Sequence, residues 1–234
     1  MKISPQNLLW AACHPGKTLR YLKHHDRIPY EVIAKYLPSA PVILEAGAAD
    51  GASTSEMAKF WPAARIHAFE PVPEAMRLTE QATSNVRDRV SLYPCALGST
   101  PGQFEMNVSG GGDAGGSQSS SLLTPSGHLD EYQNVVFKQR IEVEVVRLDD
   151  WAQQEGVEKL DFLWLDLQGF ELEALRGAEK LLSGVSAIHT EVSHRQLYEG
   201  GVLYPELESW LVQRGFRPVL SATFRLGGNV LFAR

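Results

Sequence analysis

The sequence contains few cysteines and no cluster of basic residues. Its two cysteines, Cys13 and Cys95, lie far apart and fit no metal or redox motif, so we expect both to be small packed side chains. The 22 lysines and arginines form no run, and 28 acidic residues outnumber them, which gives a formal net charge of −6. Because nucleic acids and anionic membranes attract clustered positive charge, we expect neither as the main partner.

The sequence also lacks a long apolar segment. A short apolar run near the start is too brief for the core of a signal peptide, and no later stretch approaches the length that spans a bilayer. Together with the scarcity of cysteine, this absence predicts a soluble protein in the reducing cytoplasm.

The length and hydrophobic content suit one domain. A chain of 234 residues with 44% hydrophobic side chains can enclose one substantial core. Apolar positions at helical spacing within residues 7–37 are interrupted by prolines, which predicts a short helical lead-in over residues 1–40. The remaining residues, 41–234, are expected to form an α/β domain.

Strand-like and helical segments alternate along this domain. Short apolar runs predict strands at residues 42–46, 65–70, 90–95, 160–166 and 186–192. Helical patterns predict helices at residues 53–60, after Pro73, at 171–182 and at 205–213. Ser53 or Thr54 would cap the first helix. Alternation of this kind implies crossover connections and a mostly parallel sheet.

The sequence pattern of residues 216–233 predicts an antiparallel hairpin. Strands are expected at residues 216–222 and 229–233, joined by a turn through Gly227 and Gly228. They would complete a seven-stranded sheet of the Rossmann-like kind.

The middle of the chain interrupts the alternation. Residues 103–108 and 141–146 both resemble strands, and they either pair in an antiparallel manner or extend an edge of the sheet. Between them, the segment 109–121 is rich in glycine and serine and has few large side chains. We expect it to form a mobile surface loop that closes over the site.

A glycine-containing loop follows the first predicted strand. Ligands of open parallel sheets bind beyond the carboxyl ends of the strands, where Gly47 and Gly51 would let the backbone approach closely. The next strand ends in Glu70, about twenty residues later, where a carboxylate can accept hydrogen bonds from both ribose hydroxyls. The pair predicts a nucleoside site; the alternative is a tight turn needed only for packing.

The chemistry of the loop favours S-adenosylmethionine over a dinucleotide. Dinucleotide sites use G-x-G-x-x-G to lead a pyrophosphate onto a helix N-terminus, whereas this loop contains Ala48 and Asp50. A carboxylate repels a pyrophosphate, but it attracts the amino group and the sulfonium of S-adenosylmethionine.

Five segments in register resemble the FkbM family of methyltransferases. They are LEAGAADG (44–51), AFEPVP (68–73), CALG (95–98), VRLDD (146–150), and LDLQGFE (165–171) with LRGA (175–178). The resemblance extends from about residue 40 to the end of the chain. It implies a class I methyltransferase fold with S-adenosylmethionine as the donor. The acceptor that it implies is a hydroxyl oxygen of a small molecule such as a sugar or polyketide.

The resemblance also implies roles for individual residues. Gly47, Asp50 and Gly51 would line the methionine end of the donor, Glu70 would hold the ribose, and Asp166 would face the methionine or the acceptor. The same motifs place Glu45, Pro71, Ala96 and Leu97 at the donor site, the last two against the adenine. Two departures stand out: Glu45 replaces the commoner Asp, and Gln168 and Phe170 replace the commoner Glu and Ala.

Acidic residues and a histidine are expected beyond the last parallel strands. His194 is the candidate general base for the acceptor hydroxyl, and Asp166 or Glu191 would orient it. Alternatively, His194 only bonds a loop, or these three side chains bind a divalent cation that acidifies the hydroxyl. Glu171, near them in the sequence pattern, has a simpler explanation as an acid in the first turn of a helix.

Two other functions remain open at the level of the sequence. A nicotinamide-dependent oxidoreductase would use a similar sheet, although the G-x-G-x-x-G motif is absent. A non-catalytic module would bind the cofactor without turnover. The oligomeric state is open as well, a homodimer included, and the acceptor is not encoded in the shared fold.

Overall fold

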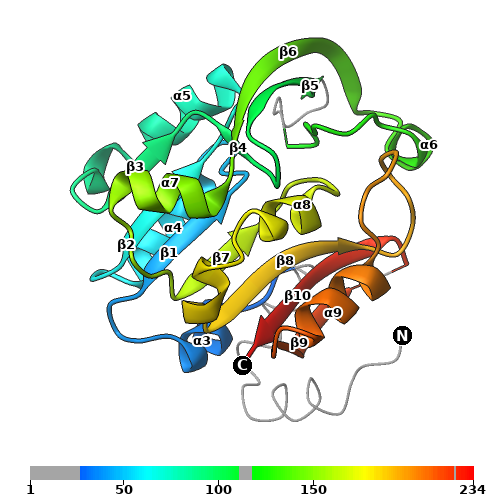
Figure 1. Cartoon of the computed structure of the whole chain (residues 1–234). Helices are drawn as coiled ribbons and strands as arrows, with labels where there is room; N and C mark the ends of the chain where they lie inside the picture. Colours follow the sequence, from blue (N-terminus) through cyan, green and yellow to red (C-terminus); the bar gives the residue numbers. More distant parts are fainter. Residues whose placement is uncertain (1–26, 111–117, 224) are drawn as a thin grey trace, which may run out of the picture.

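The computed structural model describes residues 27–110, 118–223 and 225–234. Its centre is a seven-stranded sheet of order β3-β2-β1-β7-β8-β10-β9 (Figure 1). The strands of this sheet are β1 (Val42–Ala46), β2 (Arg65–Phe69), β3 (Val90–Tyr93), β7 (Phe162–Leu165), β8 (Ala187–Ser193), β9 (Arg217–Thr223) and β10 (Gly227–Ala233).

The pairing confirms the predicted topology. β1 pairs in parallel with β2 on one side and with β7 on the other, and the parallel ladder continues to β3 and β8. β10 pairs antiparallel with both β8 and β9, so the chain closes in the expected hairpin. Because the order runs from β1 outward in one direction and from β7 outward in the other, a switch point lies between these two strands.

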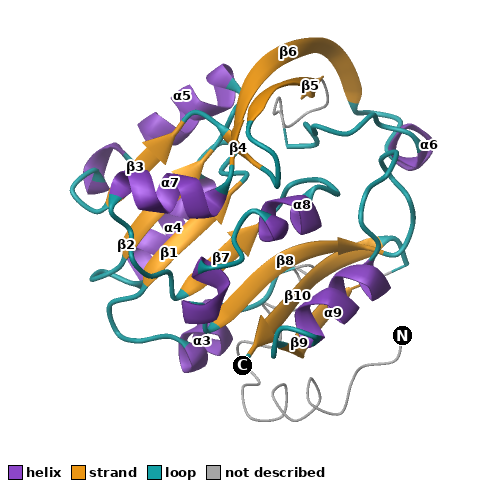
Figure 2. Ribbon diagram, in the orientation of Figure 1, coloured by secondary structure: helices purple, strands orange, loops and turns teal. Residues whose placement is uncertain are grey.

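Helices cover both faces of the sheet (Figure 2). The longer helices and short helical turns are α3 (Tyr30–Ile33), α4 (Ala52–Phe60), α5 (Pro73–Ala82), α6 (Gly127–Glu131), α7 (Leu148–Glu155), α8 (Glu171–Arg176) and α9 (Tyr204–Val212). α7, α8 and α9 contribute to the core on one face, and α3 and α4 to the core on the other. The sequence patterns did not predict α6 or α7.

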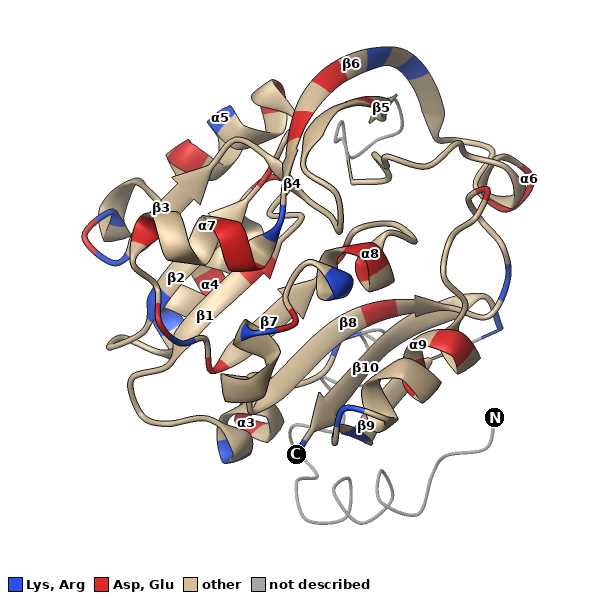
Figure 3. Ribbon diagram, viewed as in Figure 1, with Lys and Arg blue, Asp and Glu red and all other residues tan. Residues whose placement is uncertain are grey.

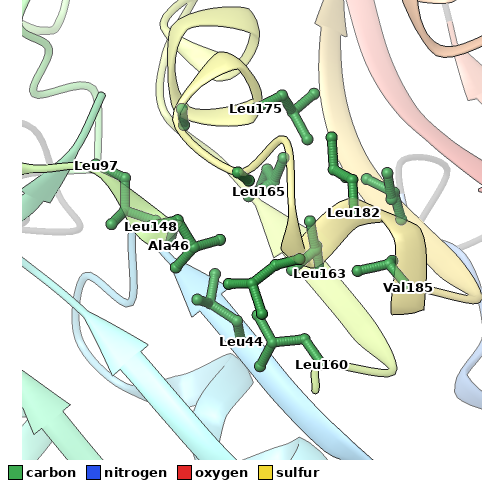
Figure 4. Close-up of a cluster of buried hydrophobic side chains, with 14 of the residues drawn as sticks. Leu44, Ala46, Leu97, Leu148, Leu160, Leu163, Leu165, Leu175, Leu182 and Val185 are labelled. Atoms are coloured by element: carbon green, nitrogen blue, oxygen red, sulfur yellow. The ribbon is translucent and has the colours of Figure 1, made fainter. Parts of the chain in front are cut away.

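The larger core lies between the sheet and the layer of α7, α8 and α9. Figure 4 shows its centre, where leucines of β1 and β7 meet those of the helices. Leu44, Leu163 and Leu175 are all essentially inaccessible to solvent. A strand that packs helices on both faces buries nearly every side chain, which explains why the residues of β1 and β7 are all apolar except Glu45.

A second, three-stranded sheet stands beside the main one. It has the order β4-β6-β5 and consists of β4 (Ala96–Leu97), β5 (Gly102–Gly110) and β6 (Val136–Val146). β5 and β6 pair antiparallel, so the first of the two alternatives for these segments is confirmed and the second is wrong.

The described ends of the serine-rich segment differ from the expected surface loop. Ser109, Ser120 and Ser121 are buried, and Ser121 exchanges backbone hydrogen bonds with Asn107 of β5. Small side chains allow this close packing against the strand. Residues 111–117 of the predicted loop lie outside the described residues.

Two predicted helix boundaries are corrected. α4 is capped by neither Ser53 nor Thr54: it begins after Gly51, whose φ is 76°, and Asp50 accepts a hydrogen bond from the N–H of Ala52. The helix predicted over 171–182 ends at Arg176. The carboxylate of Asp149 accepts hydrogen bonds from the N–H groups of residues 180 and 181, which competes with a continuous helix.

The ends of the chain complete the comparison. Gly227 and Gly228 belong to β10, so the hairpin turn precedes them. Both positions require glycine, because a Cβ atom on either would overlap a backbone carbonyl oxygen of the neighbouring strand. Of the helical lead-in, residues 1–26 lie outside the described residues, and α3 lies within the rest. No helix in the described ranges is long and apolar enough to cross a bilayer.

Candidate active site

A cavity of about 580 Å³ opens at the carboxyl ends of β1, β2, β7 and β8. This is the switch point of the sheet, where connections leave in opposite directions and the strand ends leave a crevice. The volume is in the range of small-molecule sites. The site residues predicted from the sequence that line this cavity are Gly47, Asp50, Glu70, Pro71, Ala96, Leu97, Asp166 and Glu191.

The loop after β1 is held in a fixed shape. The N–H groups of Gly47 and Ala48 both donate to the carbonyl oxygen of Phe69, at 3.0 and 3.1 Å. Ala49 has a φ of 51°, and its carbonyl oxygen accepts a hydrogen bond of 2.9 Å from the Thr79 hydroxyl on α5. These bonds anchor the loop to the neighbouring strand and helix.

The two glycines of the loop have different tasks. Gly47 has a φ of 86°, and a Cβ atom there would overlap the carbonyl oxygen of Asp166. It thus permits the loops after β1 and β7 to touch at the cavity. Gly51 does not line the cavity; a Cβ atom there would lie 2.7 Å from the Cα of Thr79. The expected place of Gly51 at the donor is corrected to helix packing.

Glu70 lies at the end of β2 with its carboxylate turned toward the loop. Its Oε2 accepts a hydrogen bond of 2.8 Å from the N–H of Ala49, and its Oε1 accepts one of 2.9 Å from the N–H of Val72. Burial raises the pKa of Glu70 to about 7, although the two backbone hydrogen bonds oppose the shift. Each carboxylate oxygen keeps a lone pair for another donor such as a ribose hydroxyl.

Glu45 does not reach the cavity, contrary to the resemblance. Its side chain is 1% exposed and accepts a short hydrogen bond from the Thr54 hydroxyl of α4. Burial raises the pKa of Glu45 to about 8, opposed by the bond from Thr54. The residue ties β1 to α4 beneath the loop, and Thr54 serves this bond rather than a helix cap.

An amide side chain joins two of the four acidic residues that line the cavity. The Nε2 of Gln168 donates to Asp166 Oδ1 and to Glu191 Oε2, both at 2.7 Å. Its Oε1 accepts a hydrogen bond of 3.0 Å from the hydroxyl of Tyr198. Gln168 has a φ of 53°, a conformation unusual outside glycine, which is held by these bonds.

Asp166 shares this network while remaining open to the cavity. Surrounding protein displaces water from its carboxylate and raises its pKa, and hydrogen bonding with Gln168 and Glu191 opposes the shift. Glu171 is buried one turn further on, where its Oε1 accepts hydrogen bonds from the N–H groups of Leu167 and Gly169. Glu171 therefore shapes the loop that carries Gln168.

The structure does not bring His194 to Asp166 and Glu191. His194 lies just beyond β8, which ends at Ser193, and it does not line the cavity. His194 is exposed and its ring packs edge-on against Tyr204 of α9. Within the described residues there is no group of three or more His, Cys, Asp or Glu side chains that would hold a metal ion.

A second cavity of about 530 Å³ adjoins the first. Sequence reasoning missed this cavity and several residues that shape the first, among them Gln168, Tyr198, His128 and Tyr132. Gln168 was noted only as a departure from the family pattern. That departure was the one available signal, because the other three lie on the 124–135 and 194–203 segments, where the sequence shows no regular period.

The cavity fits S-adenosylmethionine. Carboxylates of Asp50, Asp166 and Glu191 line it and complement the two positive charges of the donor. Glu70 lines it with a carboxylate that keeps lone pairs for further hydrogen-bond donors. Ala96 and Leu97 of β4 provide a buried apolar wall.

Comparisons with known proteins agree with this chemistry. The model of the methyltransferase FkbM domain matches residues 45–218. The 2-O-methyltransferase NoeI of Sinorhizobium fredii is 37% identical over 162 residues, which cover 68% of this chain and 66% of NoeI. The methyltransferase sdnD of Sordaria araneosa is 27% identical over 210 residues, which cover 77% of this chain and 75% of sdnD.

Among solved structures, the fibrillarin of Aeropyrum pernix, crystallised with natively bound S-adenosyl-L-methionine, is 17% identical and has a TM-score of 0.49. The alignment covers 84% of this chain and 69% of that one. The family match extends over most of the chain and includes every residue that lines the first cavity except Arg27 and Asn229. The chain belongs to the FkbM family of S-adenosylmethionine-dependent methyltransferases.

Proposed function

We propose that this enzyme methylates a hydroxyl oxygen of a small molecule. The observation that carries the proposal is the pair of carboxylates, Asp166 and Glu191, joined by Gln168 at the end of the donor cavity. The name of NoeI, a 2-O-methyltransferase, supports oxygen as the accepting atom.

The donor supplies an electrophilic methyl group on a sulfonium, and the protein supplies position and a proton acceptor. As the new oxygen–carbon bond forms and the carbon–sulfur bond breaks, the hydroxyl proton must leave. Glu191 is our candidate base because it lines both cavities. Asp166 is the positioning partner through Gln168. Glu191 replaces His194 in this role, because His194 is exposed and lines neither cavity.

The other site residues divide into contacts and supports. We assign Asp50 to the amino end of the donor, Glu70 to the ribose, and Pro71, Ala96 and Leu97 to the nucleoside wall. Gly47, Gly51 and Glu45 would act by shaping the loop and the helix that follows it.

We further propose that residues 41–234 are the donor-binding domain and that residues 1–40 lead into it. Ile28, Val32 and Ile33 are buried and belong to the core that includes Met57 of α4, so the described end of the lead-in is part of one packed body. The lone cysteines support a reducing, cytoplasmic setting.

The function is tested by turnover. Purified protein is incubated with a donor carrying an isotopically labelled methyl group and a panel of hydroxylated sugars, phenols and polyketides, and the products are analysed by mass spectrometry. We expect label on an oxygen, in a product that appears only with active enzyme. Label on nitrogen or carbon alone contradicts the assignment of oxygen.

Glu70→Ala is expected to weaken donor binding by about 10- to 100-fold, since it removes a buried acceptor of two ribose hydrogen bonds worth about 1.5–3 kcal/mol. Isothermal calorimetry with S-adenosylmethionine measures the change. Glu74→Ala is the matched control, because Glu74 is an exposed acid in the first turn of α5. Equal affinity of the Glu70 variant and the parent removes the ribose assignment.

Donor affinity should also increase with pH. Because the pKa of Glu70 is raised to about 7, this carboxyl loses its proton as the pH rises through that value, and the ionised form is the stronger acceptor. We expect binding about tenfold tighter at pH 8 than at pH 6, from the ionised fraction alone. Calorimetry of the parent and of Glu70→Ala at both values isolates this contribution; the same slope in both proteins argues against it.

A further inference from the structure

The two cavities meet at a common wall. Five residues line both of them: Tyr132, Gln168, Glu191, Leu197 and Asn229. Since the first cavity contains the loop and the carboxylates that fit the donor, the second is the adjoining space from which an acceptor hydroxyl can reach Glu191.

The second cavity is acidic at this inner wall and basic at its outer rim. Arg195, on the loop after β8, and Arg225, in the turn before β10, both line it. Arg195 pairs with Glu131 of α6 at 2.9 Å, whereas Arg225 is exposed and makes no ion pair with the described part of the chain. Figure 3 shows basic segments in this loop and this turn at the edge of the molecule. The rim thus has two cations and one carboxylate.

The walls between these ends suit a small organic molecule. The rings of Tyr132 and Tyr198 provide aromatic surface, and Gly169 and Gly201 leave the backbone bare beside them. Tyr198 is held in place, because its hydroxyl proton is shared between the carbonyl oxygen of Ser119 and Oε1 of Gln168, at 2.8 and 3.0 Å. A volume of about 530 Å³ is in the range of ligand sites.

We propose that the second cavity binds the methyl acceptor and that this acceptor carries an acidic group, a carboxylate, phosphate or sulfate, at the end away from the reacting hydroxyl. The inference rests on the proposed function, and it adds the charge class of the substrate. An anion at the rim complements the guanidinium of Arg225 and adds to the Arg195 pair, while the hydroxyl end is placed at Glu191.

The test measures binding rather than turnover. The protein is saturated with S-adenosylhomocysteine, which fills the donor cavity and cannot react. Matched pairs of compounds are then titrated by ligand-observed NMR: glucuronate against glucose, glucose 6-phosphate against glucose, and 4-hydroxybenzoate against 4-hydroxybenzyl alcohol. We expect at least one acidic member to bind about tenfold tighter than its neutral partner. The pairs distinguish a carboxylate from a phosphate requirement.

Arg225→Gln should reduce this preference to less than about threefold, because it removes the unpaired charge at the rim. Its affinity for S-adenosylmethionine should stay at the parent value, since Arg225 does not line the first cavity. Arg217→Gln is the control, an exposed arginine at the opposite end of the same hairpin.

Three results overturn the inference: equal binding of the acidic and neutral members, no binding of any acidic member, or a preference that survives in Arg225→Gln combined with Arg195→Gln. These results are separate from failure of the proposed function. That failure would appear as a lack of donor binding, or as methyl label on an atom other than oxygen.

Discussion

Gln168→Glu is expected to lower kcat by about 100-fold or more, the scale of a lost proton-transfer arrangement. The amide of Gln168 donates to Asp166 and Glu191 at once, and an ionised glutamate cannot donate to either. It would also place a third carboxylate beside two others, which raises their pKa values and keeps a proton among them. Steady-state kinetics over a range of pH should therefore show a lower kcat and a rising limb displaced to higher pH.

Two further variants separate positioning from general damage. Gln213→Glu makes the same chemical change on the exposed face near the end of α9 and should leave kcat unaltered. Gln168→Ala removes the donor without adding charge, so it should lower kcat without the same displacement of the pH profile. A fully active Gln168→Glu enzyme with the parent profile would falsify the role of Gln168 as a positioning residue.

Gly47→Ala is expected to destabilise the fold by about 3 kcal/mol or more, since the new Cβ atom needs a left-handed backbone and overlaps the carbonyl oxygen of Asp166. For a chain of this length the melting temperature should fall by roughly 10 °C. Donor binding should be lost as well, because relief of the overlap separates the loops after β1 and β7. Differential scanning calorimetry and a donor titration measure the two effects.

Gly156→Ala separates the overlap from the backbone cost. Gly156, at the end of α7, has a φ of 68° and no atom within 4 Å of an added Cβ, so only the left-handed conformation is penalised, by about 1 kcal/mol. Equal losses of stability in the two variants would show that the overlap with Asp166 adds nothing to the cost of the left-handed backbone.

Several residues that line the first cavity could be predicted from the sequence because they follow consecutive strands. Gly47 and Asp50 follow the apolar run of β1 directly, and Glu70 follows the next run at a spacing fixed by one helix and one strand. The parallel sheet and the closing hairpin could be predicted because strand-like and helical segments alternate along the sequence. The resemblance to the family added Ala96 and Leu97, which line the same cavity.

The arrangement around Gln168 could not be predicted from the sequence, because its contacts join residues that are far apart in the chain. Gln168 and Tyr198 are 30 residues apart, and Tyr198 also reaches Ser119, on a segment with no regular period. His194 was a plausible base by residue type, but it lies beyond the end of β8, where its ring packs against Tyr204 and does not line the cavity. Glu45 has the right position in the motif, yet its length lets it reach Thr54 beneath the loop.

The bonds that fix the loop after β1 bear on the entropy of donor binding. Phe69 and Thr79 already hold the backbone of residues 47–49, and Glu70 already orients the N–H of Ala49. A ligand entering this crevice has no disordered segment of that loop to immobilise, so little of its contact energy is offset by ordering the chain. Recognition at this loop can thus resemble the docking of two rigid bodies.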